Sequence, residues 1–156
     1  MGDARNTVRR ATAEDAADVA RLLHDFNTEF SEPTPGVPIL TERARRMLGD
    51  GELTVLLVGD GPNGLAQMRF LPSIWSSAPS CYLEELYVAP SLRGQGMGRA
   101  LLEATIAAAR EAEADHIDLN TGETDTAARA LYESAGFTNR EGKEDGPRML
   151  YYERYL

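Results

Sequence analysis

The amino-acid sequence predicts an α/β fold with α+β character, in which helices flank a central mixed sheet. Two observations lead to this prediction. The patterns along the chain follow the order β-α-α-β-β-β-α-β-α-β, with antiparallel hairpins first and a strand–helix–strand unit in the middle. One strand also runs directly into a glycine-rich loop that is followed by a helical pattern. At 156 residues the chain has the size of one domain, so we expect a single domain over residues 1–156.

The first part of the chain is predicted to hold an edge strand and an amphipathic helix. Residues 7–12 alternate weakly between apolar and polar side chains, as in an edge strand. Thr12 is expected to cap the helix that follows, with Glu14 and Asp15 in its first turn. Apolar residues then recur at steps of three and four, which buries one helix face: Ala16, Val19, Leu23, Phe26 and Phe30.

The next segment is rich in breakers and precedes a hairpin. Three prolines predict a loop over residues 31–40, and Thr41 is expected to cap a short helix ended by Gly49. Residues 53–58 are nearly all apolar and predict a central strand. Turn residues at 59–64 then predict a hairpin into a strand at residues 65–71.

The second half of the chain contains the strand, glycine loop and helix that are most informative about function. A strand over residues 82–88 precedes the glycine loop, and residues 97–113 have the pattern of a helix. After a short strand at 117–119, Thr124 or Asp125 is expected to cap a helix that Gly136 stops. The tyrosine-rich residues 148–155 predict a final strand.

Composition and charge restrict the classes of function. The net charge of −9 disfavours nucleic acid or an anionic membrane as a partner and is compatible with a cationic substrate. No apolar stretch is long enough for a signal peptide or a membrane span, so we expect a cytoplasmic protein. Cys81, the single cysteine, lacks metal-ligand spacing with His24 or His116, and no metal site is expected.

The glycine loop has a composition that suits a phosphate. Glycine allows close approach of the backbone, and a helix N-terminus presents free amides to an anion. The dinucleotide fingerprint fails because its third glycine would fall on Arg99, and the NTPase phosphate loop fails because no Lys-Ser/Thr pair follows. What remains is R-x-x-G-x-G from Arg93 to Gly98. A plain glycine turn capping an ordinary helix is the alternative at this point.

These motifs together resemble a known family. The loop resembles the acyl-CoA pyrophosphate loop of the GNAT superfamily of N-acetyltransferases, and ALYESAGF at residues 130–137 resembles the family's A-L-Y-E-x-x-G-F box. The order of elements is also the GNAT order over nearly the whole chain. More narrowly, YLEELYV at 82–88, with Trp75 upstream, is similar to the spermidine/spermine, diamine and thialysine N-acetyltransferases.

The resemblance implies an activity. We expect one GNAT N-acetyltransferase domain that transfers the acetyl group of acetyl-CoA to a primary amine of a small cationic acceptor, polyamine-like or diamine-like, by direct attack in a ternary complex. An aminoglycoside, an amino acid or a protein amine is the alternative acceptor, and a non-catalytic acyl-CoA-binding sensor domain is the alternative function. The long aromatic final strand favours a homodimer.

The resemblance also implies roles for particular residues. Glu84 is expected to be the general base, through a water, and Tyr132 to donate a proton to the leaving thiolate. Adjacent strand residues point to opposite faces, so only one of Glu84 and Glu85 enters the cleft unless a bulge rotates them. Expected acceptor contacts are Glu85, Glu29, Phe30 and Trp75.

For acetyl-CoA, the resemblance implies contacts along one strand, one loop and one helix start. The backbone of residues 86–88 is expected to pair with the pantetheine arm, and the amides of residues 94–99 to hold the pyrophosphate. Asp125 stands where the family usually has asparagine, which places that contact in question. The full set is Leu86, Tyr87, Val88, Arg93, Gly94, Gln95, Gly96, Met97, Gly98, Arg99, Asn120, Asp125 and Ala128.

Overall fold

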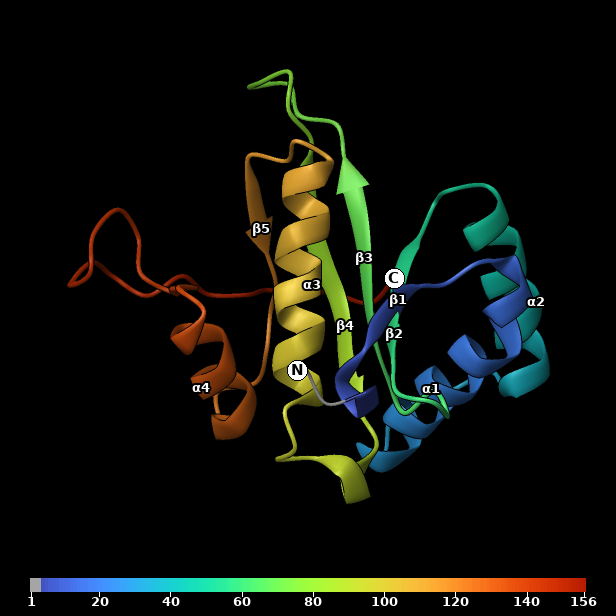
Figure 1. Cartoon of the computed structure of the whole chain (residues 1–156). Coiled ribbons are helices and arrows are strands. Elements are labelled where there is room, and N and C mark those ends of the chain that lie inside the picture. Colours follow the sequence, from blue (N-terminus) through green and yellow to red (C-terminus); the bar gives the residue numbers. More distant parts are fainter. Residues whose placement is uncertain (1–3) are drawn as a thin grey trace. The chain divides into compact units, whose positions relative to one another are not determined.

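A computed structural model describes residues 4–156 of the chain (Figure 1). These residues form two compact units, the first ending at Leu119 and the second comprising Asn120–Leu156. Among the described residues, no helix is long and apolar enough to cross a membrane.

The first unit is built on one mixed sheet, as predicted. Four strands are antiparallel to their neighbours, and the last pairs in parallel. The spatial order equals the chain order: β1 (Val8–Arg10), β2 (Thr54–Val58), β3 (Gly64–Leu71), β4 (Ser80–Val88) and β5 (His116–Asp118). The apolar strand β2 is fully buried between two neighbours, which confirms its predicted interior position.

Helices cover both faces of this sheet (Figure 1). The helices α1 (Ala16–Glu29) and α2 (Val37–Gly49) share a core with Leu57, Leu65 and Tyr87 of the strands. Side chains alternate along a strand, so Leu56 and Met68 point to the opposite face, where α3 (Met97–Glu111) packs. Three 3-10 turns complete the unit: η1 (Ala4–Asn6), η2 (Ala13–Asp15) and η3 (Pro90–Leu92).

The predicted cap Thr12 lies at the start of the turn η2, and α1 itself has Asp15 as its N-cap. The turn η2 leads into α1, and Thr12 forms a capping box with Asp15, whose Oδ2 accepts from the Thr12 amide at 2.8 Å. Arg9 donates to both carboxylate oxygens of Asp15, at 2.8 and 2.9 Å. These bonds, the one from Arg9 first, lower the pKa of Asp15 to about 2.

The start of the second helix was predicted wrongly. Helix α2 begins at Val37, four residues before Thr41, and includes Pro38 in its first turn. Proline is well suited to that position, because its fixed φ is helical and its missing amide hydrogen would have no helical partner there. Gly36, at φ 94°, caps the helix instead, and the Thr41 hydroxyl donates to the Val37 carbonyl at 2.7 Å.

The second unit is dominated by one helix. The helix α4 (Thr126–Ser134) is capped by Asp125, whose Oδ1 accepts from the Ala128 amide at 3.1 Å, and the chain turns at Gly136 with φ 90°. Both features were predicted. The predicted final strand is wrong: Arg148 forms one isolated bridge with Arg140, and residues 149–156 form no strand. A strand requires a neighbour along its length, which this segment lacks within the described residues.

Candidate active site

The strand β4 changes its surroundings half-way along. It pairs with β3 over its whole length, but with β5 only at Ser80, Cys81 and Tyr82. From Leu83 to Val88 its other edge has no strand partner in the described part of the chain. The two strands therefore part after Tyr82, as expected of a sheet edge that admits an extended ligand. Residues 86–88, predicted to pair with the pantetheine arm, lie on this open edge.

A bulge in the β3–β4 pairing brings two carboxylates together. Gln67 faces Glu85 and Met68 faces Leu83, so Glu84 has no partner of its own on β3. Bulged residues depart from strict alternation. The Glu84 carboxylate indeed contacts the side chain of Gln67, the residue opposite Glu85. Both glutamates therefore lie toward the same side of the sheet.

Both oxygens of the Glu84 carboxylate have partners. Its Oε1 lies 2.7 Å from Nε of Arg69, and its Oε2 accepts a hydrogen bond from Nε2 of Gln67 at 2.7 Å. Its side chain is 18% exposed. The carboxylate is therefore fixed in position by two neighbours on β3.

Glu85 is in a different electrostatic state. Burial, and secondarily the negative charge of Glu84, raises the pKa of Glu85 from 4.5 to about 7. Near neutral pH its carboxyl is therefore divided between the protonated and ionised forms. A group in that condition can both accept and release a proton, which is what a general base requires.

The glycine loop has the geometry that a diphosphate needs. Gly94 and Gly96 have φ of 75° and 90°, and Gly96 caps α3 in the left-handed conformation. The Ala100 amide bonds to the Gly96 carbonyl, so the amides of residues 97–99 precede the first helical hydrogen bond and have no acceptor within the helix. Apart from its two chain neighbours, no residue in the described part of the chain lies within 4 Å of a Cβ built on Gly94. The loop is therefore open at the point where an anion would approach, and residues 94–99 fit the pyrophosphate role.

Arg93 and Glu29 contact each other. The Arg93 guanidinium binds both carboxylate oxygens of Glu29, at 2.7 and 3.0 Å, and donates from Nε to the Val88 carbonyl at 2.9 Å. It also lies 5.6 Å from the ring centroid of Tyr87. These contacts tie the end of α1 to the loop after β4. The predicted contacts of Arg93 with pyrophosphate and of Glu29 with the acceptor remain predictions.

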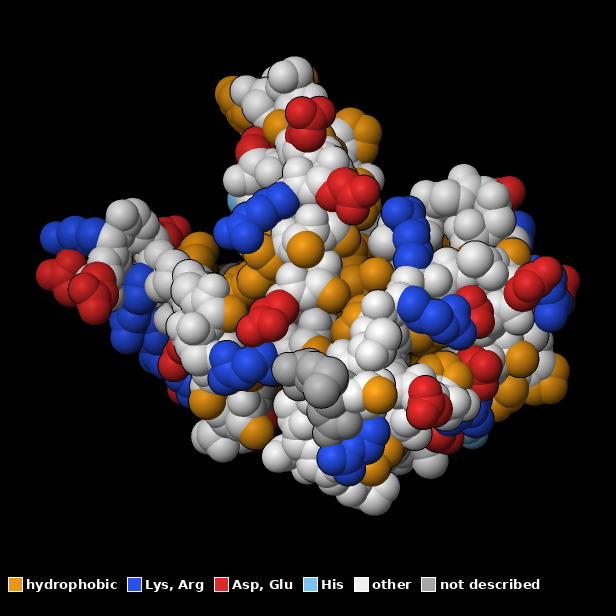
Figure 2. Space-filling model, viewed as in Figure 1, with side chains coloured by type: hydrophobic (Ala, Val, Ile, Leu, Met, Phe, Trp, Pro, Cys, Tyr) orange, Lys and Arg blue, Asp and Glu red, His pale blue; other side chains and the backbone are white. Residues whose placement is uncertain are grey.

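Two predicted acceptor contacts are exposed aromatic residues. Phe30 follows α1 and lies edge-on to Phe26, with ring centroids 5.3 Å apart. Trp75 is 93% exposed, in the connection between β3 and β4, which lies at the top of Figure 2 and shows separate apolar patches at its edges. Both are accessible to a ligand, and their role in acceptor binding stays a prediction.

The surroundings of Cys81 make its thiol unreactive. It is fully buried, and burial, with the negative charge of Asp118 second, raises its pKa to about 11. A thiol in that state is a poor nucleophile, so Cys81 is a structural residue of the strand. Within residues 4–156, no three His, Cys, Asp or Glu side chains are arranged to hold a metal ion.

The remaining predicted site residues belong to the second unit. There the Tyr132 ring packs at an angle against Phe137, with centroids 6.0 Å apart. Asp125 uses its carboxylate to cap α4 at Ala128, as described above. The proton-donor role of Tyr132 and the CoA contacts of Asn120, Asp125 and Ala128 remain predictions.

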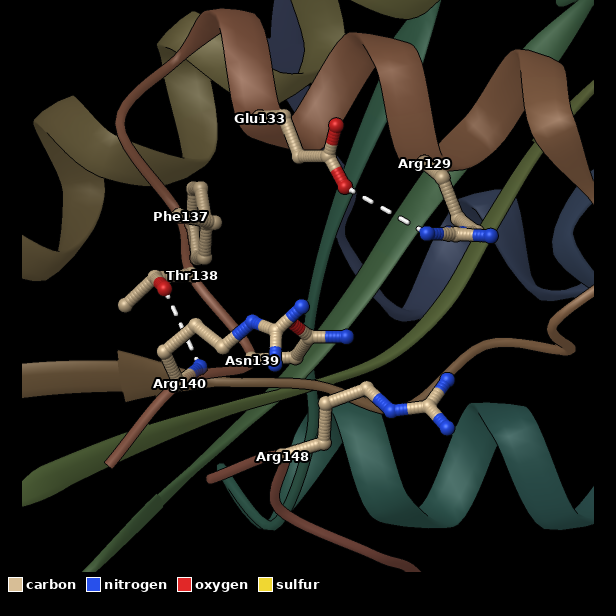
Figure 3. A pocket seen from close by; sticks show the side chains of 7 residues that line it. All are labelled: Arg129, Glu133, Phe137, Thr138, Asn139, Arg140 and Arg148. Atoms are coloured by element: carbon tan, nitrogen blue, oxygen red, sulfur yellow. Dashed lines mark hydrogen bonds and ion pairs between the residues drawn. The ribbon is translucent and has the colours of Figure 1, made fainter. Parts of the chain in front are cut away.

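A cavity of about 260 Å³ also lies within the second unit (Figure 3). Its walls are Arg129, Glu133, Phe137, Thr138, Asn139, Arg140 and Arg148. Three guanidinium groups favour an anion. Each already contacts an oxygen of its own unit: Arg129 the Glu123 carbonyl at 2.9 Å, Arg140 the Gly146 carbonyl at 3.3 Å and Arg148 the Glu123 carboxylate at 3.2 Å. Carboxylates offset part of this charge, because Glu123 contacts Arg148 and Glu133 lies 3.8 Å from Arg129. None of the predicted site residues is among the walls.

Sequence reasoning missed Gln67 and Arg69, the two residues that hold Glu84. A signal was present, because polar side chains interrupt the otherwise apolar strand LAQMRFL. Gln67 is buried, with an exposed fraction of 8%. A buried polar residue in a strand usually has a specific hydrogen-bond partner, which here is Glu84.

The comparisons with known proteins decide the family. A profile of the acetyltransferase (GNAT) family matches residues 19–137. The chain belongs to the GNAT family. It is accordingly an acetyl-CoA-dependent N-acetyltransferase, which confirms the predicted fold, enzyme class and acetyl donor.

Individual relatives refine the resemblance. This acetyltransferase is 31% identical over 156 aligned positions to aminoglycoside N(6')-acetyltransferase type 1 of Stenotrophomonas maltophilia, covering 96% of this chain and 94% of the relative. An acetyltransferase crystal structure from Arthrobacter sp. FB24 is 43% identical, with a TM-score of 0.89 over 100% of this chain and 99% of that one.

The narrower resemblance to polyamine and thialysine enzymes needs correction. Thialysine N-epsilon-acetyltransferase of Mus musculus is 28% identical over 113 aligned positions, which cover 64% of this chain and 65% of that protein. This match is shorter and weaker than the match to the aminoglycoside enzyme. The resemblance of YLEELYV therefore does not single out the polyamine group.

Proposed function

We propose that this acetyltransferase acts on a primary amine of a small polycationic acceptor, and that an aminoglycoside is the first class to test. The observation that carries the proposal is the pair of glutamates on β4, beside the edge that β5 leaves open. Two neighbouring carboxylates attract a cation, and Glu85, with a pKa of about 7, can remove a proton. The named aminoglycoside relative, aligned over nearly its full length, supports this acceptor class.

The proposed proton path uses Glu85 in preference to Glu84. An alkylammonium with a pKa of about 10 must lose a proton before its nitrogen can attack. Glu85 accepts that proton from the nitrogen, while Glu84, bonded to Arg69 and Gln67, holds the cation nearby. This assignment exchanges the roles that the family resemblance favoured. Bound acetyl-CoA supplies the electrophile, an acetyl thioester.

The proposed acetyl-CoA contacts follow the predicted set. The backbone of residues 86–88 receives the extended arm along the open edge of β4, and the amides of residues 94–99 receive the pyrophosphate. The Tyr132 hydroxyl is the proposed proton donor to the leaving sulfur. Replacing Tyr132 with phenylalanine would test that role, with lowered turnover and little change in the KM for acetyl-CoA as the supporting result.

An amine panel with a thiol-release assay tests the acceptor. The panel contains aminoglycosides with and without a 6'-amine, diamines and polyamines, thialysine, and single amino acids. We expect thiol release with aminoglycosides that carry the 6'-amine and little with those that lack it. Turnover of amino acids alone would contradict the proposal.

Polyamines and thialysine form the second candidate acceptor class. The match to the thialysine enzyme supports it, as does the acidic net charge of −9. Preference for diamines over aminoglycosides in the same panel, measured by kcat/KM, would favour this class.

We also propose a homodimer that involves the C-terminal segment, residues 149–156. This segment has no strand partner and exposes six large apolar side chains: Met149, Leu150, Tyr151, Tyr152, Tyr155 and Leu156. Exposed apolar patches commonly mark protein interfaces. Light scattering of the full chain and of a chain ending at Arg148 tests this, with a dimer and a monomer as the expected masses. A dimer that survives the truncation would remove this segment from the interface.

A further inference from the structure

Gln67 has a buried acceptor atom that the site described so far does not use. Its amide nitrogen Nε2 donates to Oε2 of Glu84 at 2.7 Å. A carboxylate can only accept, so the NH₂ end of the amide must face Glu84, and this fixes the orientation of the whole group. The carbonyl oxygen Oε1 therefore points away from Glu84. It is buried and has no hydrogen-bond partner in the described part of the chain.

The residue that carries this oxygen is paired with Glu85 across the sheet. Gln67 and Glu85 are directly opposite each other in the β3–β4 register, and such pairs share one face with their side chains within contact distance. Only 8% of the surface of Gln67 is exposed. Buried polar atoms nearly always have a hydrogen-bond partner. We therefore expect this acceptor to receive a hydrogen bond from a donor.

The chemistry of a carbonyl restricts what that donor can be. Oε1 can accept an N–H or O–H and can donate nothing. Arg69, the nearest cationic group known to contact the cluster, already uses its Nε on Glu84. An acceptor amine, by contrast, brings two or three N–H groups, and only one of them can give its proton to Glu85.

We propose that Gln67 Oε1 accepts a hydrogen bond from the nitrogen that becomes acetylated, so that Gln67 and Glu85 bind the amine from two adjacent positions. This inference rests on the proposed acetylation of an amine at the β4 site. Gln67 would then have two functions through two atoms: its nitrogen holds Glu84, and its oxygen orients the amine. A fixed second acceptor would also direct the nitrogen lone pair, because it restricts rotation about the bond to Glu85.

The test compares two variants that each remove one donor from Glu84. Gln67→Met and Arg69→Met both do so, but only Gln67→Met also removes the carbonyl oxygen. We expect Gln67→Met to raise the KM for the amine roughly tenfold, with the KM for acetyl-CoA unchanged. Arg69→Met should raise the KM for the amine clearly less. Equal effects of the two variants would overturn the proposal, because Gln67 would then act only through Glu84.

The pH profile distinguishes this proposal from a second one, in which the donor to Oε1 is Glu85 and not the amine. If Oε1 instead accepts from the protonated carboxyl of Glu85, Gln67→Met should move the midpoint of kcat/KM against pH toward acid and leave the KM for the amine unchanged. That outcome overturns the proposal. A raised KM with an unmoved midpoint supports it.

Thermal unfolding of Gln67→Met and Arg69→Met shows whether each variant is folded. The amine used is whichever member of the panel the wild-type enzyme acetylates best, so an error in the proposed acceptor class appears in the panel and not in this comparison.

Discussion

The two halves of β4 belong to one strand but differ in their pairing and in their chemistry. At residues 80–82 the strand pairs on both sides, and its buried side chain is Cys81, with a pKa of about 11. At residues 83–88 it pairs on one side only, and it carries Glu84 and Glu85. The first half is a structural part of the sheet. The second half carries the proposed base, because β5 ends beside it and Glu84 forms a bulge in its pairing with β3.

The comparison shows how a sheet can contain a reactive site without losing its core. Burial raises the pKa of both Cys81 and Glu85, to about 11 and about 7. In the cysteine this makes the reactive thiolate inaccessible at neutral pH. In the glutamate the same effect brings the titration into the working range, because a carboxyl starts from a lower value.

The largest expected effect is on the reactive half. Glu85→Gln should lower kcat/KM by about 10²- to 10⁴-fold and abolish the rise of rate with pH near 7, because the proposed base is gone. Glu84→Gln should keep that rise but move its midpoint below about 7, because the charge of Glu84 contributes to the raised pKa of Glu85. Steady-state pH profiles measure both. The reverse result, with the rise lost only in Glu84→Gln, would restore Glu84 as the base.

The next effect concerns the pairing that supports the reactive half. A Cβ on Gly64 would lie 2.6 Å from the Tyr87 carbonyl oxygen, which belongs to the backbone and cannot move aside easily. Gly64→Ala should therefore lower the free energy of unfolding by about 2 kcal/mol or more, measured by chemical denaturation. Gly49→Ala is the matched control, because nothing lies within 4 Å of its Cβ, and it should cost no stability. An unaffected Gly64→Ala would mean that the strands can shift at this position.

A smaller effect is expected in the structural half. Cys81→Ala should lower the free energy of unfolding by about 1 kcal/mol, because it leaves a small void in the core, and should leave kcat/KM unchanged. Thermal unfolding and the thiol-release assay measure the two quantities. A large loss of activity in a folded Cys81→Ala protein would contradict the division of β4 into two halves.

The smallest effect is a pH-dependent gain in stability. The pKa of Glu85 is about 7 in the folded state and 4.5 ordinarily, so folding favours the protonated form, and wild-type stability falls as pH rises from about 4.5 through about 7. Glu85→Gln removes that loss. After allowance for solvent screening, the variant should be more stable than wild type by on the order of 1 kcal/mol at pH 8 and by little at pH 4. Equal differences at both values would show that Glu85 titrates normally.

The sequence predicted the sheet, its strands and most helix caps, because these depend on local patterns. The alternation of β4, the glycine loop and the capping role of Asp125 were all visible in neighbouring residues. The start of α2 was missed because Pro38 was interpreted as a breaker, although a first-turn proline favours a helix.

Features that depend on distant residues could not be predicted. The bulge at Glu84 arises from the register between β3 and β4, and no residue type in YLEELYV marks it. The contacts of Glu84 with Gln67 and Arg69, and hence the different states of the two glutamates, follow from that register. The tyrosine-rich C-terminal segment has strand-forming residues, but its conformation depends on a partner.

The exposure of Trp75 has a practical optical consequence. It is the single tryptophan of the chain and is 93% exposed, so ultraviolet emission excited at the indole band arises from one surface connection. Emission from the native protein should already resemble that of indole in water and change little on denaturation, which makes it a poor reporter of folding. For the same reason, any molecule that covers this connection should shift the emission to shorter wavelength and thus reveal its own binding.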